Sequence, residues 1–224
     1  MTWQAEGIVR IGVFDSGIGG LSVANAIERA MPEHEVVFRA DSEHVPYGTR
    51  ALDEIYGFTL PILWRLVEQD EVQVIVVACN TVTTNFIERL RQELPLPLVG
   101  LEPGVKPAAE ATETGTITVC ATPRTLESPR YAWLKETYAE GVRVLEPDCS
   151  DWSYMIETNS LDASRIAEIV DGSLAEGSDQ IVLGCTHYHW IEDAIRAGAD
   201  GRAQVLQPEQ PVIEQLARVL APLA

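Results

Sequence analysis

Short apolar runs alternate with stretches of helical periodicity along this chain of 224 residues, and that alternation limits the fold more than any other feature. Apolar runs that predict buried strands include residues 9–14, 72–78, 116–121 and 180–183. Amphipathic stretches that predict helices, such as residues 21–30, lie between such runs. Strands that alternate with helices form βαβ units. We therefore predict an α/β fold with mostly parallel sheets.

The same alternation occurs twice, with a second start near Gly104. The first pass adds strands at residues 35–40 and 97–101, and the second adds strands at 142–145 and 205–206. The remaining helices are expected at residues 51–69, 84–93, 104–112, 129–138, 164–175, 190–197 and 212–220. We interpret the two passes as two successive α/β halves.

Two of the four cysteines follow apolar runs at equivalent places in the two halves. Cys79 ends the run in "VIVVACNT", and Cys185 ends the run in "IVLGCTHY". Ligands of open parallel sheets bind beyond the carboxyl ends of the strands. If the halves face each other, the two thiols therefore flank one ligand. Cys120 and Cys149 complete the set, which contains no CxxC pair, and reduced thiols are expected in a cytosolic chain.

The neighbours of each thiol favour chemistry over simple burial. Asn80 and Thr81 supply hydrogen-bond donors where a helix begins, and a helix N-terminus lowers the pKa of a nearby thiol. Thr186 and His187 follow Cys185, and a histidine can help a thiol gain or lose a proton near neutral pH. The alternatives are an inert buried cysteine at position 79 and a structural histidine at position 187.

A metal site is a further alternative for the same residues. Cys79, Cys185, His187 and His189 could supply four ligands, but their spacing does not match the usual zinc patterns. We therefore expect no metal.

The segment from Asp15 to Gly20, "DSGIGG", follows the first strand. As a plain feature it is a glycine-rich turn, and a nucleotide site is disfavoured because the pattern is not GxGxxG and Asp15 would repel phosphate. In a functional interpretation, Ser16 and backbone N–H groups hold a carboxylate or an amine. Asp15 then binds an ammonium group or acts on a neighbouring thiol.

Composition restricts the partners and the compartment. The net charge of −18 disfavours binding to nucleic acid or to anionic lipid. No apolar run reaches the roughly 18 residues that cross a bilayer, and the start "MTWQAEGIVR" does not read as a secretory signal, so we expect a cytoplasmic protein. Only Lys106 and Lys135 are lysines among sixteen basic residues, which suggests a salt-adapted or GC-rich source.

Six motifs occur in an order that resembles the glutamate racemase family, within the larger aspartate/glutamate racemase group. They are "IGVFDSGIGGLSV", "DSEHVPYGTR", "VVACNT", "EPGVKPA", "TPRTLES" and "LGCTHY". The resemblance covers nearly the whole chain. It implies interconversion of L- and D-glutamate for peptidoglycan synthesis, and hence for cell-wall biogenesis and cell shape, with no metal, pyridoxal phosphate or nucleotide. The partners it implies are a small amino acid and, as an expectation, a second copy in a homodimer.

The resemblance also implies two pseudo-symmetric domains with the active site in the cleft between them. We assign residues 1–98 plus 208–224 to the first domain and residues 99–207 to the second. Racemisation needs a base on one face of Cα and an acid on the other, which two thiols from two domains supply. By resemblance, Cys79 takes the proton from D-glutamate and Cys185 takes it from L-glutamate.

Other residues carry over by position. Asp15 would assist Cys79, while His187 and Glu157 would assist Cys185. The residues expected to bind the amino acid are Ser16, Pro46, Tyr47, Gly48, Asn80, Thr81, Thr122, Thr125 and Thr186. Taken singly, "PYG" passes for a turn, the two threonines at 122 and 125 for helix caps, and Glu157 for a solvated loop acid.

The chain departs from the family pattern beside the second thiol. His189 and then Trp190 stand where family members commonly have proline after Cys-Thr-His-Tyr, and Ser150 stands where proline usually follows Cys149. These changes leave both thiols in place and bear on substrate preference instead. The alternatives are therefore a racemase of aspartate or another acidic amino acid, and a catalytically weak homologue that binds amino acids.

Overall fold

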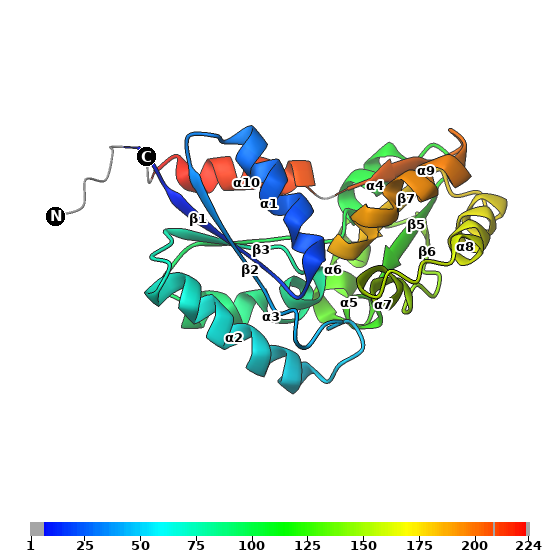
Figure 1. The fold of residues 1–224 in the computed structure, drawn as a ribbon. Helices are drawn as coiled ribbons and strands as arrows, with labels where there is room; N and C mark the ends of the chain where they lie inside the picture. Colours follow the sequence, from blue (N-terminus) through cyan, green and yellow to red (C-terminus); the bar gives the residue numbers. More distant parts are fainter. Residues whose placement is uncertain (1–6, 208, 223–224) are drawn as a thin grey trace.

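The computed structural model describes residues 7–207 and 209–222 and contains two four-stranded sheets, one in each half of the chain (Figure 1). Every strand pair is parallel, and the strand orders are β2-β1-β3-β4 and β6-β5-β7-β8. The strands are β1 (Arg10–Asp15), β2 (Glu35–Ala40), β3 (Val74–Val77), β4 (Leu98–Gly100), β5 (Thr116–Ala121), β6 (Arg143–Leu145), β7 (Gln180–Gly184) and β8 (Gln204–Leu206). The predicted α/β class with parallel sheets is confirmed.

Helices and two short 3-10 turns connect the strands. The α-helices are α1 (Leu21–Ala30), α2 (Leu52–Glu68), α3 (Asn80–Glu93), α4 (Val105–Ala111), α5 (Pro123–Leu126), α6 (Pro129–Tyr138), α7 (Trp152–Glu157), α8 (Ala163–Ala175), α9 (Glu192–Ala199) and α10 (Glu209–Leu220). The 3-10 turns are η1 (Ile18–Gly20) and η2 (Thr186–Ile191).

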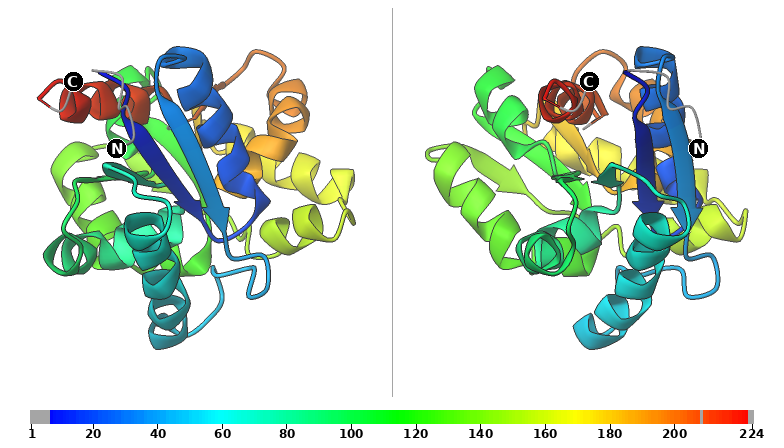
Figure 2. Two further views of the ribbon diagram at one scale, coloured as in Figure 1. Left: turned by 60° about the vertical axis from the view of Figure 1, so that its left-hand side comes forward. Right: turned by 90° about the vertical axis from the view of Figure 1, so that its left-hand side faces the viewer.

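The central strands of the first sheet, β1 and β3, are buried on both faces because their residues are mostly apolar, whereas β2 is partly exposed. Ile11 and Val13 pack with residues of α1 and α10 on one face. Phe14 and Val77 pack with residues of α2 and α3 on the other. Figure 2 shows α10, from the end of the chain, beside α1 on the first sheet.

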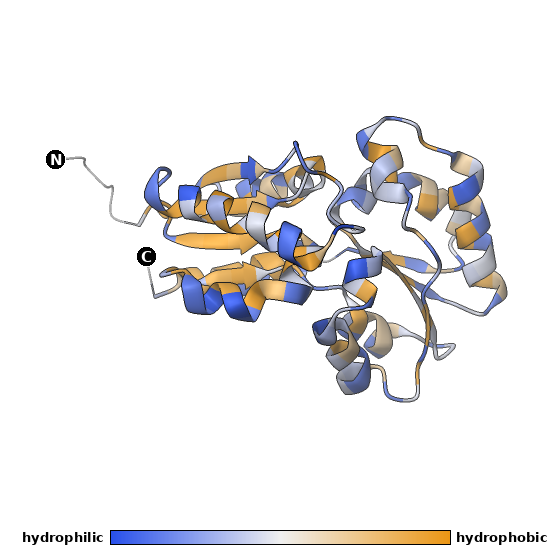
Figure 3. Ribbon diagram, turned by 90° about the horizontal axis from the view of Figure 1, so that it is seen from below, coloured by the Kyte–Doolittle hydropathy of each residue, from blue (hydrophilic) through white to orange (hydrophobic). Residues whose placement is uncertain are grey.

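The second sheet repeats this arrangement. Ile117 and Val119 pack against α4 and α6, while Ile181 and Leu183 pack against α7, α8 and α9. The hydropathy colouring in Figure 3 follows the same layers, with apolar strands inside and polar residues on the outer faces of the helices.

Each sheet has a topological switch point, where the chain leaves neighbouring strands toward opposite sides. In the first sheet this point lies between β1 and β3, and in the second it lies between β5 and β7. Ligands of open α/β sheets bind beyond the strand ends at such points. Cys79 follows β3 and Cys185 follows β7, so both thiols lie at a switch point.

Some boundaries differ from the prediction. Helix α3 was expected to begin at residue 84, but it begins at Asn80, because the extended residue Cys79 is its N-cap. Helix α9 was expected to begin at residue 190. It begins at Glu192 instead, because the residues before it form the 3-10 turn η2. Helix α7 was not predicted at all. Residues 1–6, Pro208, and residues 223 and 224 of the proposed first domain lie outside the described residues.

Within the described parts of the chain, no helix is long and apolar enough to cross a membrane. All four cysteines are reduced and buried.

Candidate active site

Cys79 lies beside the end of the first strand. Strands β1 and β3 are parallel neighbours, with Phe14 opposite Val77, so the residues that follow them meet at one sheet edge. The Cys79 thiol donates to Ser16 Oγ over 3.4 Å. Asp15 is fully buried there, and its Oδ2 accepts from the backbone N–H of Gly20 at 2.7 Å.

Burial raises the pKa of the Cys79 thiol, and the Asp15 carboxylate raises it further. The helix N-terminus had predicted a lowered pKa, and that prediction is wrong for the free protein. Burial likewise raises the pKa of Asp15, against the opposing effect of His187. Cys79 is therefore a protonated thiol at neutral pH.

Cys185 has a histidine and a serine as neighbours. His187 Nδ1 lies 3.8 Å from the sulfur, and Ser153 Oγ lies 3.6 Å from it on the side of α7. The other ring nitrogen, Nε2, lies 2.5 Å from Glu157 Oε1. Cys185, His187 and Glu157 thus form a continuous chain from a buried thiol to a partly buried carboxylate.

His187 is a cation in this chain at neutral pH. Burial opposes its charge, but its contacts with Cys185 and Glu157 outweigh burial and raise the pKa of His187 to about 10. The hydrogen bond from His187 correspondingly lowers the pKa of Glu157. An imidazolium at this distance stabilises negative charge on the Cys185 sulfur.

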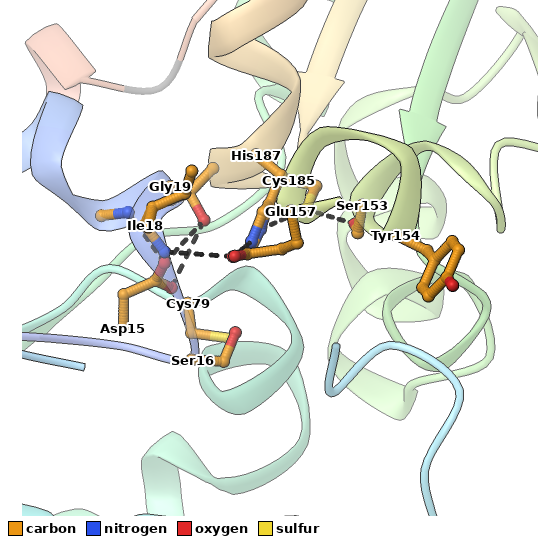
Figure 4. A network of polar contacts seen from close by, with 12 residues as sticks. Asp15, Ser16, Ile18, Gly19, Cys79, Ser153, Tyr154, Glu157, Cys185 and His187 are labelled. Carbon is orange, nitrogen blue, oxygen red and sulfur yellow. Dashed lines mark hydrogen bonds and ion pairs between the residues drawn. The ribbon is translucent and has the colours of Figure 1, made fainter. Parts of the chain in front are cut away.

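The two halves meet through polar contacts between these groups, as Figure 4 shows. Thr186 donates to Asp15 Oδ2 over 3.2 Å, and the backbone N–H of Ile18 donates to Glu157 Oε1 over 3.2 Å. A side chain at position 19 would place its Cβ 2.6 Å from the backbone nitrogen of His187. Gly19, the second glycine in "DSGIGG", therefore permits the close approach of η1 to η2.

A second polar cluster joins the halves at the start of α3. Thr81 Oγ1 lies 3.0 Å from Thr122 Oγ1 and 3.4 Å from Thr125 Oγ1. Gly48 lies against this cluster, because a Cβ there would approach the Thr122 side chain to 2.5 Å. Asn80 donates from Nδ2 to the Leu101 carbonyl, while its buried Oδ1 has no partner among the described residues.

Tyr47 is buried in the same apolar cluster as Cys79. Its hydroxyl donates to Asp41 over 2.6 Å, and Asp41 also lies 2.9 Å from His44 Nδ1. Pro46 follows a cis peptide bond from Val45.

The structure therefore brings most predicted site residues into two adjoining polar clusters. Sequence reasoning missed Ser153, Asp41 and His44. The motif "DSEHVPYG" did contain a signal for the last two, since an Asp and a His precede the tyrosine at short spacing.

The described residues contain no group of three His, Cys, Asp or Glu side chains that could hold a metal ion. His189 was one candidate ligand, and its ring instead contacts Ser22 and Glu209.

Comparison with known proteins identifies the family. The sequence profile described as Asp/Glu/Hydantoin racemase matches residues 12–216, which is most of the chain. The chain belongs to the Asp/Glu/hydantoin racemase family. The resemblance inferred from the six motifs is thereby confirmed.

Individual relatives agree with this assignment. A glutamate racemase from Ectopseudomonas mendocina is 39% identical over 215 residues, covering 94% of this chain and 81% of that protein. The structure of Escherichia coli glutamate racemase in complex with L-glutamate and the activator UDP-MurNAc-Ala is similar, with a TM-score of 0.87, 25% identity and coverage of 95% and 82%. A glutamate racemase isoform from Bacillus anthracis has a TM-score of 0.83 and 28% identity, with coverage of 96% and 83%.

Proposed function

We propose that this protein interconverts L- and D-glutamate by transferring protons through two thiols, Cys79 and Cys185. The observation that carries the proposal is the pair of buried thiols, one from each half, in a single polar cluster. The glutamate racemases among its relatives support glutamate as the substrate.

The reaction needs one thiolate and one thiol in each starting state. The thiolate removes the Cα proton from one face, and the opposite thiol gives its proton to the other face, so the two sulfurs exchange protonation states. The His187 cation lies beside Cys185, where it stabilises negative charge on the sulfur, and the Asp15 carboxyl lies near Cys79, where it disfavours a thiolate. We propose that the form of the protein with a thiolate at Cys185 accepts L-glutamate.

Binding of the amino acid uses the groups around the thiols. The unpartnered Oδ1 of Asn80 is a buried acceptor that suits an ammonium donor. The hydroxyl groups of Thr81, Thr122 and Thr125 suit a carboxylate, because they can exchange their mutual hydrogen bonds for bonds to its oxygens. Ser16, Pro46, Tyr47, Gly48 and Thr186 complete the proposed binding set.

The wider role follows from the family. We propose that D-glutamate made here serves peptidoglycan synthesis and cell shape in the cytoplasm, without a cofactor, and that the protein forms a homodimer. We also propose that residues 1–98 with 208–224 and residues 99–207 are the two domains, with the active site in the cleft between them.

The proposal is tested by incubating the protein in D2O with L-glutamate, D-glutamate and the two enantiomers of aspartate in turn. Circular dichroism follows inversion, and mass spectrometry follows deuteration at Cα. We expect both signals with glutamate from either direction. Faster inversion of aspartate would assign the protein to the aspartate alternative, and no exchange with any of the four would refute racemisation.

The thiols are tested by Cys79→Ser and Cys185→Ser. Each should lower kcat by roughly 10²–10⁴-fold, the scale of one lost acid–base group. Cys120→Ser is the matched control, because Cys120 is a buried thiol on β5 that is paired with Cys149 and has no proposed part in proton transfer. Full two-way turnover in either test variant would contradict the two-thiol mechanism.

A further inference from the structure

We infer that His189 is a positioning residue whose side-chain hydrogen bonds hold the turn that carries Cys185 and His187 against the first half of the molecule. We call these contacts of His189 the latch. The inference rests on the proposed function for its kinetic consequences, but its structural basis is independent.

The imidazole of His189 joins three elements. It belongs to η2, two residues after His187, and its side chain is only 4% exposed. Nδ1 lies 2.8 Å from Ser22 Oγ on α1 and 3.1 Å from Glu209 Oε1 on α10. Helices α1 and α10 both pack on the first sheet, so one ring atom connects the second half to two helices of the first.

The hydrogen bonds determine which nitrogen carries the proton. Ser22 donates its own hydroxyl proton to the Gly19 carbonyl over 3.1 Å, so toward His189 it acts as an acceptor. The Glu209 carboxylate also accepts. Its pKa is lowered by the contact with His189, which is consistent with an ionised acceptor. Nδ1 therefore carries a proton and shares it between Ser22 and Glu209.

The latch acts close to the reacting groups. Ser22 lies in the first turn of α1, directly after η1. Turn η1 supplies the Ile18 N–H that holds Glu157 and the Gly19 backbone that lies against His187. Tying η2 to the start of α1 therefore fixes the spacing between the Cys185–His187 pair and the Asp15–Cys79 pair. A misplacement of about 1 Å between reacting groups lowers rates by roughly 10²-fold.

Of the two ring nitrogens of His189, only Nδ1 holds the turn in place. Nε2 of His189 is buried without a partner among the described residues. Burying an unpaired polar atom is unfavourable, so the contacts at Nδ1 must offset it. A variant that keeps a donor only at the Nδ1 position should therefore keep the latch.

The test compares four variants in the full-length protein. Asparagine places an amide N–H near the position of Nδ1, whereas glutamine places it near Nε2, so His189→Asn should retain the latch and His189→Gln should lose it. His189→Leu removes both nitrogens at similar volume. Trp190→Ala is the control, because Trp190 is the next residue and is 54% exposed.

Two readouts are needed. The first is kcat/KM for each glutamate enantiomer, which should fall about ten-fold in His189→Leu and His189→Gln, the scale of one hydrogen bond to a charged group. The second is the rate at which iodoacetamide alkylates each cysteine in the native protein, resolved by peptide mass spectrometry. Loosening the latch should speed alkylation of Cys79 and Cys185 and leave Cys120 unchanged.

The pattern of outcomes separates the latch from general stability and from the proposed function. A rise at Cys120 equal to that at Cys79 and Cys185 would indicate global unfolding and overturn the inference. Wild-type alkylation rates and kcat/KM in His189→Leu would overturn it as well, and so would equal behaviour of His189→Asn and His189→Gln. If the wild-type protein does not racemise glutamate, the alkylation pattern still decides whether the latch exists.

Discussion

His187 and Glu157 place a positive charge beside the second thiol. The carboxylate at 2.5 Å keeps the imidazole protonated although the ring is only 3% exposed, and the protonated ring faces the sulfur of Cys185. Asp15 has the opposite effect on Cys79, because a buried carboxyl near a thiol disfavours the thiolate. Two chemically identical side chains thus lie in different electrostatic surroundings.

We predict that His187 titrates near pH 10 in the wild-type protein and at a lower pH in Glu157→Gln, because the contact with Cys185 remains but the neutral amide no longer favours the cation. Nitrogen-15 NMR of labelled histidine measures this directly in the two proteins. Titration of His187 near 6.5 in both proteins would contradict the ion pair.

The same pair gives a pH dependence of stability. The raised pKa of His187 means that its contribution is full below 6.5 and is lost as pH rises through about 10. The lowered pKa of Glu157 means that its contribution is full above 4.5 and is lost as pH falls through the lower, folded-state value. The difference in Tm between the wild type and Glu157→Gln should therefore be largest between pH 4.5 and 6.5 and should shrink on both sides. A difference that is constant with pH would contradict this.

At the scale of elements, the site depends on how closely η1 and η2 approach. Gly19→Ala would place a methyl group 2.6 Å from the backbone nitrogen of His187 and 2.7 Å from the carbonyl carbon of Thr186. Backbone atoms cannot move aside as a flexible side chain can. We predict that Gly19→Ala destabilises the fold by about 1–3 kcal/mol and lowers kcat.

The matched control is Gly57→Ala in the exposed surface of α2, where an added Cβ meets nothing within 4 Å. Alanine is the better helix former, so this variant should gain about 0.5–1 kcal/mol. Urea denaturation and steady-state kinetics measure both variants. Equal stability of the two alanine variants would show that the approach of η1 to η2 is not tight.

Sequence reasoning located the elements that have a clear period and missed those that are too short to show one. The apolar runs placed β3 and β7, and thereby Cys79 and Cys185, at strand ends. Helix α7 has six residues, fewer than two turns, so no periodicity could reveal it, and Ser153 was missed with it. The contacts of Thr186 with Asp15 depend on how the two halves pack, which local sequence does not encode.

At the scale of the whole molecule, the net charge of −18 is spread over a single small protein. Like charges on a compact surface repel one another, and this repulsion weakens as salt shortens the screening length from roughly 30 Å at 0.01 M to roughly 3 Å at 1 M. We predict that Tm rises with KCl over this range. A matched series in sucrose, which does not screen charge, separates screening from general solute effects, and a Tm indifferent to KCl would contradict the prediction.

The central claim is that Cys79 and Cys185 act on opposite faces of one Cα, and each thiol can be examined alone. In D2O, Cys185→Ser retains only the base proposed for D-glutamate, and Cys79→Ser retains only the base proposed for L-glutamate. The measurement is Cα deuteration of each recovered enantiomer, without inversion, in each variant. We predict that Cys185→Ser deuterates D-glutamate alone and that Cys79→Ser deuterates L-glutamate alone. Deuteration of both enantiomers by either single-thiol variant would contradict the claim.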